Sequence, residues 1–396
     1  MSKAAAHDAQ REELLALADS LSQRFAPRLN ELEANRYLPQ DMAEDLAQAG
    51  LYRMLTPRQY GGLEVNVKTF VEVVERLAQT DASVAWCTFI ACTSCVLAAY
   101  LPQDSARELY GEPNLKASGV FAPRGKAVRT VQDGVPGYRI SGRWSWGSAS
   151  RNADLILGGC LIINEQGKPE TLADGSPRVQ LMAFRRDQVQ HLDNWSAFGL
   201  CGSGSGEYEV RDVFVAERHS ASLTADQPLA QPLYRFPVFG LLGIGVGAVA
   251  LGLARHALDH MNELARERMP QFSSKPLAER ATTQQAIARG EASVRAARAL
   301  LMESLGSAWE QAENGAITVE QRRDIRLATT HAVHAAQEVI GSMYQLGGGA
   351  AIFDNSPLQR CLRDIHVVTQ HFMVSESTYE LTGRLFLGLD TNVSML

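Results

Sequence analysis

The chain has 396 residues, of which 45% are hydrophobic and 21% charged, so a small disulfide-stapled module, a disordered chain and a collagen-like repeat are all excluded. It carries 38 basic and 44 acidic residues, a formal charge of -6, and has no basic run long enough to follow a phosphate backbone, so nucleic acid is not an expected partner. Six scattered cysteines do not suggest a disulfide framework, and the opening residues lack an apolar signal segment, so we expect a cytoplasmic protein.

The first part of the chain has a helical pattern. Apolar residues such as Val74 and Leu77 recur at spacings of three and four, which predicts helices that bury one face. Pro57 lies in a connecting loop, and Asp81 has the chemistry of an N-cap for a second apolar helix. We therefore expect a helical domain over residues 1–115.

The pattern changes to short β-type runs after residue 117. Gly, Pro, Asn and Asp separate these runs, and no helical segments lie between them, so a doubly wound parallel sheet is disfavoured. We expect an antiparallel barrel or sandwich over residues 116–228. The predicted strands cover residues 138–146, 155–163, 179–184 and 208–215.

Long helical patterns return after residue 233. Val294, Ala297 and Leu301 step by three and four, as in a helix of a bundle, and we expect a C-terminal helical bundle over residues 229–396. Residues 236–254 form an uncharged run that is long enough to span a membrane. Its glycines favour a buried helix with close small-residue packing over a membrane span.

Several kinds of site have no signature. The chain has no GxGxxG after a strand, no P-loop, no HExxH and no GxSxG. Cys92 and Cys95 form a CxxC on an apolar helix and are expected in the core. His256 and His260 are spaced like metal ligands, but no carboxylate pattern completes a site, so no metal is expected.

Three weaker patterns occur in a fixed order. The first is GRWSWGS at residues 142–148, which ends a predicted strand with Trp146 and Ser148. The second follows Trp195 and contains Ser203 and Ser205 between glycines. The third is QLGGG followed by LQRCLRD at residues 358–364. Each pattern has an ordinary interpretation: a core aromatic, a hairpin connection, or a helix C-cap and turn.

Together with PRQYGG at residues 57–62, these patterns resemble the acyl-CoA dehydrogenase superfamily over nearly the whole chain. The resemblance implies a mostly α fold with an inserted β-domain, namely an N-terminal helical domain, a central β-domain and a C-terminal four-helix bundle. It also implies a flavin between these parts and a homotetramer.

The resemblance also implies roles for the three patterns. Trp146 would flank the isoalloxazine ring, Ser148 would hydrogen-bond its N5/O4 edge, and Ser203 and Ser205 would lie in the flavin-binding loop. The turn after the long helix would contact the distal part of the flavin across a subunit interface, through Gln345, Gly347, Gly348 and Gly349.

One departure from the dehydrogenases bears on the activity. The place of their catalytic glutamate holds His371, and residues 227–254, the other location for that base, contain no Asp or Glu. Asp81, Ser83 and Trp86 match the start of a helix in the two-component flavin-dependent monooxygenases of this fold. The chain is more similar to that branch than to the dehydrogenases.

This branch implies an oxygenase component that receives reduced FAD or FMN from a separate NAD(P)H flavin reductase and adds O2 to form a C4a-hydroperoxyflavin. The expected substrate is a small aromatic of the indole or indole-3-acetate type. His371, with an ordinary pKa near about 6.5, would transfer a proton near neutral pH, and Ser148 would assist. The substrate pocket would be lined by aromatic residues, with core packing as the alternative: Trp86, Phe89, Phe121 and Phe239.

Three alternatives stay open. The chain fits an acyl-CoA dehydrogenase or flavin oxidase with an atypical base, since Tyr379 and Glu380 resemble the dehydrogenase signature displaced by seven residues. It also fits an N- or S-oxygenase of the same fold. A non-catalytic flavoprotein scaffold is the third alternative.

Overall fold

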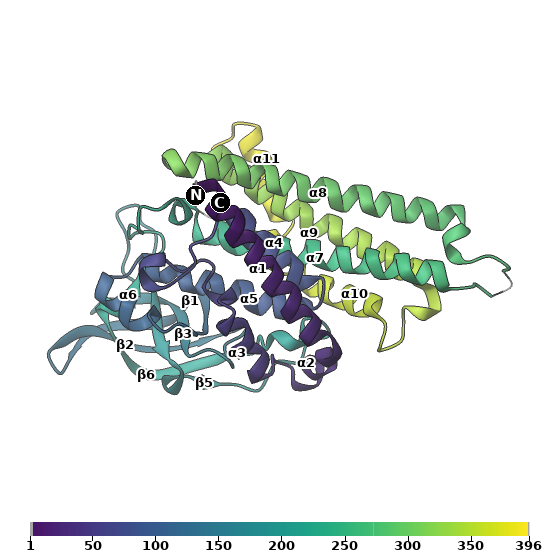
Figure 1. Ribbon diagram of the computed structural model, residues 1–396. Helices are drawn as coiled ribbons and strands as arrows, with labels where there is room; N and C mark the ends of the chain where they lie inside the picture. Colours follow the sequence, from purple (N-terminus) through teal and green to yellow (C-terminus); the bar gives the residue numbers. More distant parts are fainter. Residues whose placement is uncertain (1–2, 272, 395) are drawn as a thin grey trace.

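Helices form both ends of the chain and one β-sheet lies between them in sequence. The computed structural model describes residues 3–271, 273–394 and 396. Figure 1 shows the sheet on one side of the molecule, the long helices α7, α8 and α9 along the opposite side, and helices α1, α4 and α5 between them.

The N-terminal helices bury the faces that their apolar spacing predicts. On α4, Val74 and Leu77 are buried, as expected. The carboxylate of Asp81 accepts hydrogen bonds from the backbone N–H groups of Ser83 and Val84 at 2.9 and 3.1 Å, which confirms it as the N-cap of α5. The helices are α1 Lys3–Phe25, α2 Leu29–Asn35, α3 Gln40–Gln48, α4 Val67–Ala78, α5 Ala82–Cys95 and α6 Gln103–Tyr110.

The β-strands form one seven-stranded sheet in the order β5-β6-β2-β1-β3-β4-β7. The sheet is mixed and not wholly antiparallel, because β1 and β3 are parallel neighbours. Strand β1 was missing from the sequence prediction, since Pro123 and Gly125 interrupt its pattern at two shifts of register. The strands are β1 Ala117–Gln132, β2 Val135–Trp144, β3 Leu155–Ile163, β4 Val179–Arg185, β5 Gln190–His191, β6 Tyr208–Ala216 and β7 Ser220–Ala221.

The C-terminal part packs long helices against one another, as the periodicity predicts. Buried Val294, Ala297 and Leu301 lie on one face of α8, and α7 and α9 pack side by side. The shorter α10 contacts both α7 and α9. The helices are α7 Val238–Glu267, α8 Ala281–Asn314, α9 Val319–Gly347, α10 Pro357–Val368 and α11 Ser377–Phe386.

The apolar helix α7 is the centre of the core. A Cβ at Gly245 would come within 2.5 Å of the Phe89 ring, and one at Gly252 within 2.3 Å of the backbone oxygen of Glu75. Small residues therefore let α7 approach α4 and α5 closely, as expected for residues 236–254. Among the described residues, two helices are long and apolar enough to cross a membrane, 82–99 and Val238–Glu267, and both are mostly buried inside the protein.

The fold is thus the mostly α architecture with an inserted β-region that the sequence predicts. The N-terminal helices end at Tyr110, the strands run from Ala117 to Ala221, and α7 begins at Val238. The division into domains near residues 115 and 228 stays a prediction. The ends of helices and strands show where secondary structure changes, but they do not show which segments fold as separate units.

Candidate active site

Three serine hydroxyls form a buried chain at the end of β2. Ser148 Oγ lies 2.6 Å from Ser205 Oγ, which lies 2.7 Å from Ser203 Oγ. The indole N–H of Trp86 donates to Ser148 Oγ at 3.0 Å. A serine hydroxyl has one proton and two acceptor positions, and Trp86 occupies one acceptor position of Ser148. Ser148 therefore keeps a donor and an acceptor to divide between Ser205 and a ligand.

The loop that carries Ser148 is held by backbone contacts from both sides. The Ser118 hydroxyl donates to the backbone oxygen of Ser148 at 2.6 Å, and the N–H of Ala149 donates to the backbone oxygen of Ser203 at 2.9 Å. Ala149 has a left-handed backbone with φ of 61°. The loop after β2 and the glycine-rich loop before β6 therefore fix each other, and their hydroxyls meet at Ser148.

Trp146 lies in this loop and not in a strand, so the predicted strand 138–146 is wrong at its end. β2 stops at Trp144, and Trp146 adopts a left-handed backbone with φ of 70° that turns its side chain outward. The indole is 71% exposed and meets the ring of Trp195 edge to face, with centroids 6.2 Å apart. An exposed planar surface beside a row of serine hydroxyls fits an isoalloxazine ring, which has an apolar face and a polar edge.

A cluster of aromatic rings lies next to this hydroxyl chain. The ring of His371 is 5.8 Å from Trp86 and 5.0 Å from Phe372, centroid to centroid. Phe239 lies 6.5 Å from Phe372 and 6.3 Å from Phe121, and Phe89 lies 4.9 Å from Trp86. We call these six residues the aromatic cluster: Trp86, Phe89, Phe121, Phe239, His371 and Phe372.

The structure brings every predicted pocket residue into this cluster together with His371. Phe372 was not predicted, although its position next to His371 was a usable signal. Trp86 belongs to both groups, because its ring contacts His371 and its N–H contacts Ser148. The two predicted catalytic side chains, His371 and Ser148, are therefore linked through a single tryptophan.

Burial sets the protonation state of His371. The ring lies among apolar side chains, which lowers its pKa to about 4, and the nearby Arg326 charge acts in the same direction. The N–H of Met373 donates to His371 Nδ1 at 3.3 Å, so the ring proton is on Nε2. The ordinary pKa assumed from the sequence is therefore wrong for this site: near neutral pH, His371 is a neutral hydrogen-bond donor.

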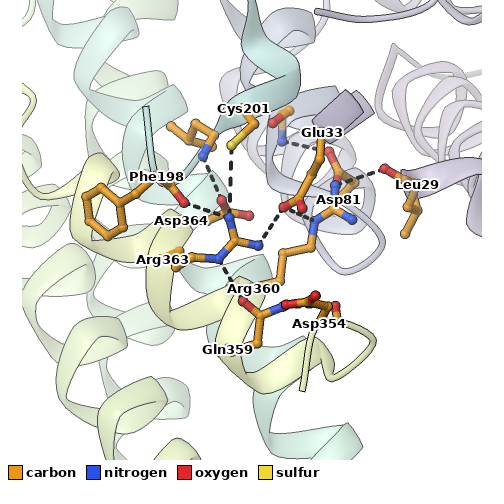
Figure 2. Close-up of polar contacts among 12 residues, drawn as sticks. Leu29, Glu33, Asp81, Phe198, Cys201, Asp354, Gln359, Arg360, Arg363 and Asp364 are labelled. Atoms are coloured by element: carbon orange, nitrogen blue, oxygen red, sulfur yellow. Dashed lines mark hydrogen bonds and ion pairs between the residues drawn. The ribbon is translucent and has the colours of Figure 1, made fainter. Parts of the chain in front are cut away.

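Charged side chains of α10 fasten the serine loop and α5 to the helical bundle. Figure 2 shows that Arg363 and Asp364 point toward the loop that carries Cys201, whereas Arg360 points toward Asp81 and Leu29. Asp364 accepts from the N–H of Leu200 at 2.6 Å, and Arg363 donates to the backbone oxygen of Phe198 at 2.6 Å. These bonds fix the position of the loop segment that directly precedes Ser203 and Ser205 in the chain.

The same cluster reaches the start of α5. Arg360 pairs with Asp81 at 2.8 Å, and Asp81 caps the helix that carries Trp86. Burial, with the charge of Asp81, raises the pKa of Asp364 to about 7. The LQRCLRD segment was recognised in the sequence only as a family pattern, and the contacts of Arg360, Arg363 and Asp364 show that it positions both the serine loop and α5.

The predicted turn at the end of α9 lies apart from these groups within one chain. Arg268 donates to the backbone oxygen of Gly347, and a Cβ there would come within 2.6 Å of Leu358. Gln345 is exposed. Within the described residues, no hydrogen bond or ring contact joins Gln345, Gly347, Gly348 or Gly349 to Ser148 or the aromatic cluster, so their contact with a flavin stays a prediction.

Two family models match the chain. Residues 7–108 match the model described as acyl-CoA dehydrogenase, N-terminal domain, and residues 244–376 match acyl-CoA dehydrogenase, C-terminal domain. The chain is 34% identical to "Indole-3-acetate monooxygenase" of Pseudomonas putida, over 94% of this chain and 92% of that protein.

Two further relatives carry a flavin in their descriptions. The chain is 26% identical to "Flavin-dependent monooxygenase, oxygenase subunit HsaA" of Mycobacterium tuberculosis, over 97% of this chain and 98% of that one. Its fold matches the structure of XiaF from Streptomyces in complex with FADH2 and glycerol, with a TM-score of 0.89, 26% identity and 98% of both chains covered. The chain belongs to the flavin-dependent monooxygenases of the acyl-CoA dehydrogenase family.

Proposed function

We propose that this protein is the oxygenase component of a two-component monooxygenase and that it hydroxylates indole-3-acetate or a closely related aromatic acid. The observation that carries the proposal is the position of Trp86, which joins the serine chain to the aromatic cluster. A flavin edge at Ser148 and an aromatic substrate beside His371 would then both lie next to Trp86. The name of the Pseudomonas putida relative supports the substrate.

The flavin would be held by residues of the two loops. Trp146 would cover one face of the ring, and Ser148, backed by Ser205 and Ser203, would hydrogen-bond its polar edge. Bound reduced flavin supplies the electrons that activate O2. Trp86 keeps the Ser148 hydroxyl in place, and its own ring excludes water from the same side, which favours oxygen transfer over release of hydrogen peroxide.

His371 would orient the substrate. Its Nε2–H can donate to an oxygen atom, while Nδ1 is held by Met373. The neighbouring Phe372 and Phe239 offer apolar surfaces on which an aromatic ring packs edge to face. His371 and Ser148, both in contact with Trp86, would therefore act as positioned hydrogen-bond groups.

The name of one relative supports the proposed partners. The description "oxygenase subunit" of the Mycobacterium tuberculosis relative supports a separate NAD(P)H flavin reductase as the source of reduced FAD or FMN. We further propose a cytoplasmic homotetramer. In it, Gln345 and the glycines after it would contact the flavin of a neighbouring subunit.

A dehydrogenase activity has less support in the site. Glu380, the carboxylate nearest in pattern to the dehydrogenase base, is exposed on α11, and Tyr379 contacts His334 at 5.7 Å. Among the described residues, no hydrogen bond or ion pair joins a carboxylate to His371, and no carboxylate contributes to its pKa shift.

The test supplies the protein with chemically reduced flavin, O2 and indole-3-acetate, and analyses the product. Hydroxylated product without a reductase supports the proposal. In parallel, acyl-CoA is supplied with an artificial electron acceptor and no added reductase. Oxidation of acyl-CoA without hydroxylation of the aromatic would support the dehydrogenase, whereas binding of reduced flavin with neither reaction would support a scaffold.

A further inference from the structure

Arg326 is a buried cation on α9 beside the aromatic cluster. It is 4% exposed, and its Nη1 lies 3.2 Å from the sulfur of Met373, two residues after His371. A Cβ at Gly243 of α7 would lie 3.4 Å from the same Nη1. The guanidinium is therefore enclosed by α7, α9 and the turn that carries His371.

This guanidinium lacks the partners that a buried charge needs. Across residues 3–271, 273–394 and 396, no carboxylate oxygen lies within 4.0 Å of it. Its Nε is buried without an acceptor, and the sulfur that it contacts is a weak acceptor. Burial lowers the pKa of Arg326 to about 10, so the side chain is still charged near neutral pH.

Two other arginines, one buried and one partly buried, show how this chain normally satisfies a guanidinium inside the protein. Arg53, which is 5% exposed, donates to the backbone oxygens of Glu112, Tyr60 and Tyr110. Arg360 pairs with the carboxylate of Asp81 at 2.8 Å. Arg326 differs from both, because the described residues supply it with neither carbonyl oxygens nor a carboxylate.

Arg326 lies next to residues of the aromatic cluster. Its charge acts on His371, and Gly243 lies one helical turn after Phe239, so guanidinium and aromatic rings share one region. A side chain of another protein has little access to a group that is 4% exposed. An anion that pairs with Arg326 would therefore have to be small, and the aromatic cluster beside it would take an aromatic ring.

We propose that Arg326 binds the carboxylate of an aromatic acid substrate and so determines specificity for acids over neutral aromatics. The proposal rests on the proposed function, because it places the substrate in the aromatic cluster. A guanidinium can donate two parallel hydrogen bonds to a carboxylate, which supplies both orientation and charge neutralisation. An acid held in this way would place its ring beside His371.

The test measures binding of two ligands of similar size to the flavin-loaded protein by calorimetry: indole-3-acetate, and indole-3-ethanol, which has a hydroxyl in place of the carboxylate. In Arg326→Met, affinity for the acid is expected to fall on the order of a hundredfold, while affinity for the alcohol changes less than about threefold. Arg326→Lys keeps the charge but loses the paired donors. Its affinity for the acid is expected to lie between that of the wild type and that of Arg326→Met.

Arg323→Met is the matched control. Arg323 is on the same helix, but it pairs with Asp324 and lies over the ring of Phe386. The Arg323→Met variant should keep the wild-type preference for indole-3-acetate over indole-3-ethanol. An unchanged preference in Arg326→Met would overturn the proposal. If that variant does not fold, the wild type decides, because equal affinity for acid and alcohol also overturns it.

Failure of the proposed function is separable from failure of this inference. If wild-type protein binds the acid through Arg326 but forms no hydroxylated product, the acid-binding role stands and the monooxygenase assignment for this acid falls. If both indoles are hydroxylated equally well and Arg326→Met alters neither, the function stands and the role of Arg326 is rejected.

Discussion

Trp86 and Ser148 lie 62 residues apart in the chain and share a buried hydrogen bond of 3.0 Å. This bond connects α5 of the N-terminal helices with the loop after β2. Since the ring of Trp86 also contacts His371 from the C-terminal part, one side chain joins all three parts of the fold. The orientation of the Ser148 hydroxyl, and with it the proposed flavin contact, therefore depends on how the helices pack against the sheet.

Replacing Ser148 by alanine should weaken both stability and flavin binding. The change leaves the N–H of Trp86 without its acceptor, a cost of about 1 to 3 kcal/mol for a buried donor. Calorimetry with reduced flavin and denaturant unfolding measure the two effects. Ser94→Ala is the control, because Ser94 makes a buried bond of 2.7 Å to the backbone oxygen of Ile90 elsewhere on α5. Equal flavin affinity in the two variants would contradict the proposed role of Ser148.

Replacing His371 by asparagine should uncouple O2 consumption from hydroxylation. The asparagine oxygen can still accept from the N–H of Met373, but the ring donor at Nε2 is lost. We expect product formation to slow by about a hundredfold while hydrogen peroxide release increases, because positioned proton-transfer and hydrogen-bond groups contribute about that much. Product per O2 consumed is the measurement.

His334→Asn is the control for that experiment. His334 lies on α9 and contacts the backbone oxygen of Val374 at 3.2 Å. It has no ring contact with the aromatic cluster among the described residues. Coupling should survive in this variant, and a similar loss in both would assign the effect to general disturbance of the turn.

The pKa of His371 gives a prediction with a defined sign. The value is lowered from 6.5 to about 4 by burial, so the unfolded chain binds more protons than the folded one between those pH values. The stability that neutral His371 supplies is complete above about pH 6.5 and is lost as the pH falls through about 4. Imidazole NMR signals should show a neutral ring down to pH 5. A midpoint near 6.5 would show that the ring is solvated.

Asp364 predicts the opposite dependence on pH. Its pKa is raised from 3.8 to about 7, so the folded chain holds an extra proton between those values and stability falls as the pH rises through that window. Asp364→Asn keeps an oxygen for the N–H of Leu200 and removes the charge. Between pH 5 and pH 8 the wild type should lose about 2 to 3 kcal/mol more than the variant in the free energy of unfolding, since a pKa change of one unit is worth about 1.4 kcal/mol. Parallel pH curves would contradict the prediction.

Local signals in the sequence were enough to predict much of the fold. The apolar faces of α4 and α8 and the cap at Asp81 depend on neighbours within a few residues, and all are confirmed. Strand β1 was missed because Pro123 and Gly125 break its alternation. Its parallel pairing with β3 is a long-range property that no local pattern encodes.

The sequence predicted which residues form the candidate site, but it did not predict their protonation states. Burial decides the protonation of His371 and Asp364, and a sequence does not show which residues surround them. Arg326 was missed, although a signal existed: it lies on the same helical face as Thr329, Thr330 and Val333, all of which are buried. An arginine within such a face is a reason to look for an anion.

The most direct test of oxygen transfer to the aromatic substrate mixes the purified protein with chemically reduced flavin, indole-3-acetate and O2 enriched in the heavy oxygen isotope. The product is then analysed by mass spectrometry. If the protein is an oxygenase component, the hydroxylated indole carries one labelled oxygen atom and no reductase is required once reduced flavin is supplied. Complete conversion of the labelled O2 to hydrogen peroxide, or a product oxygen derived from water, would contradict that assignment.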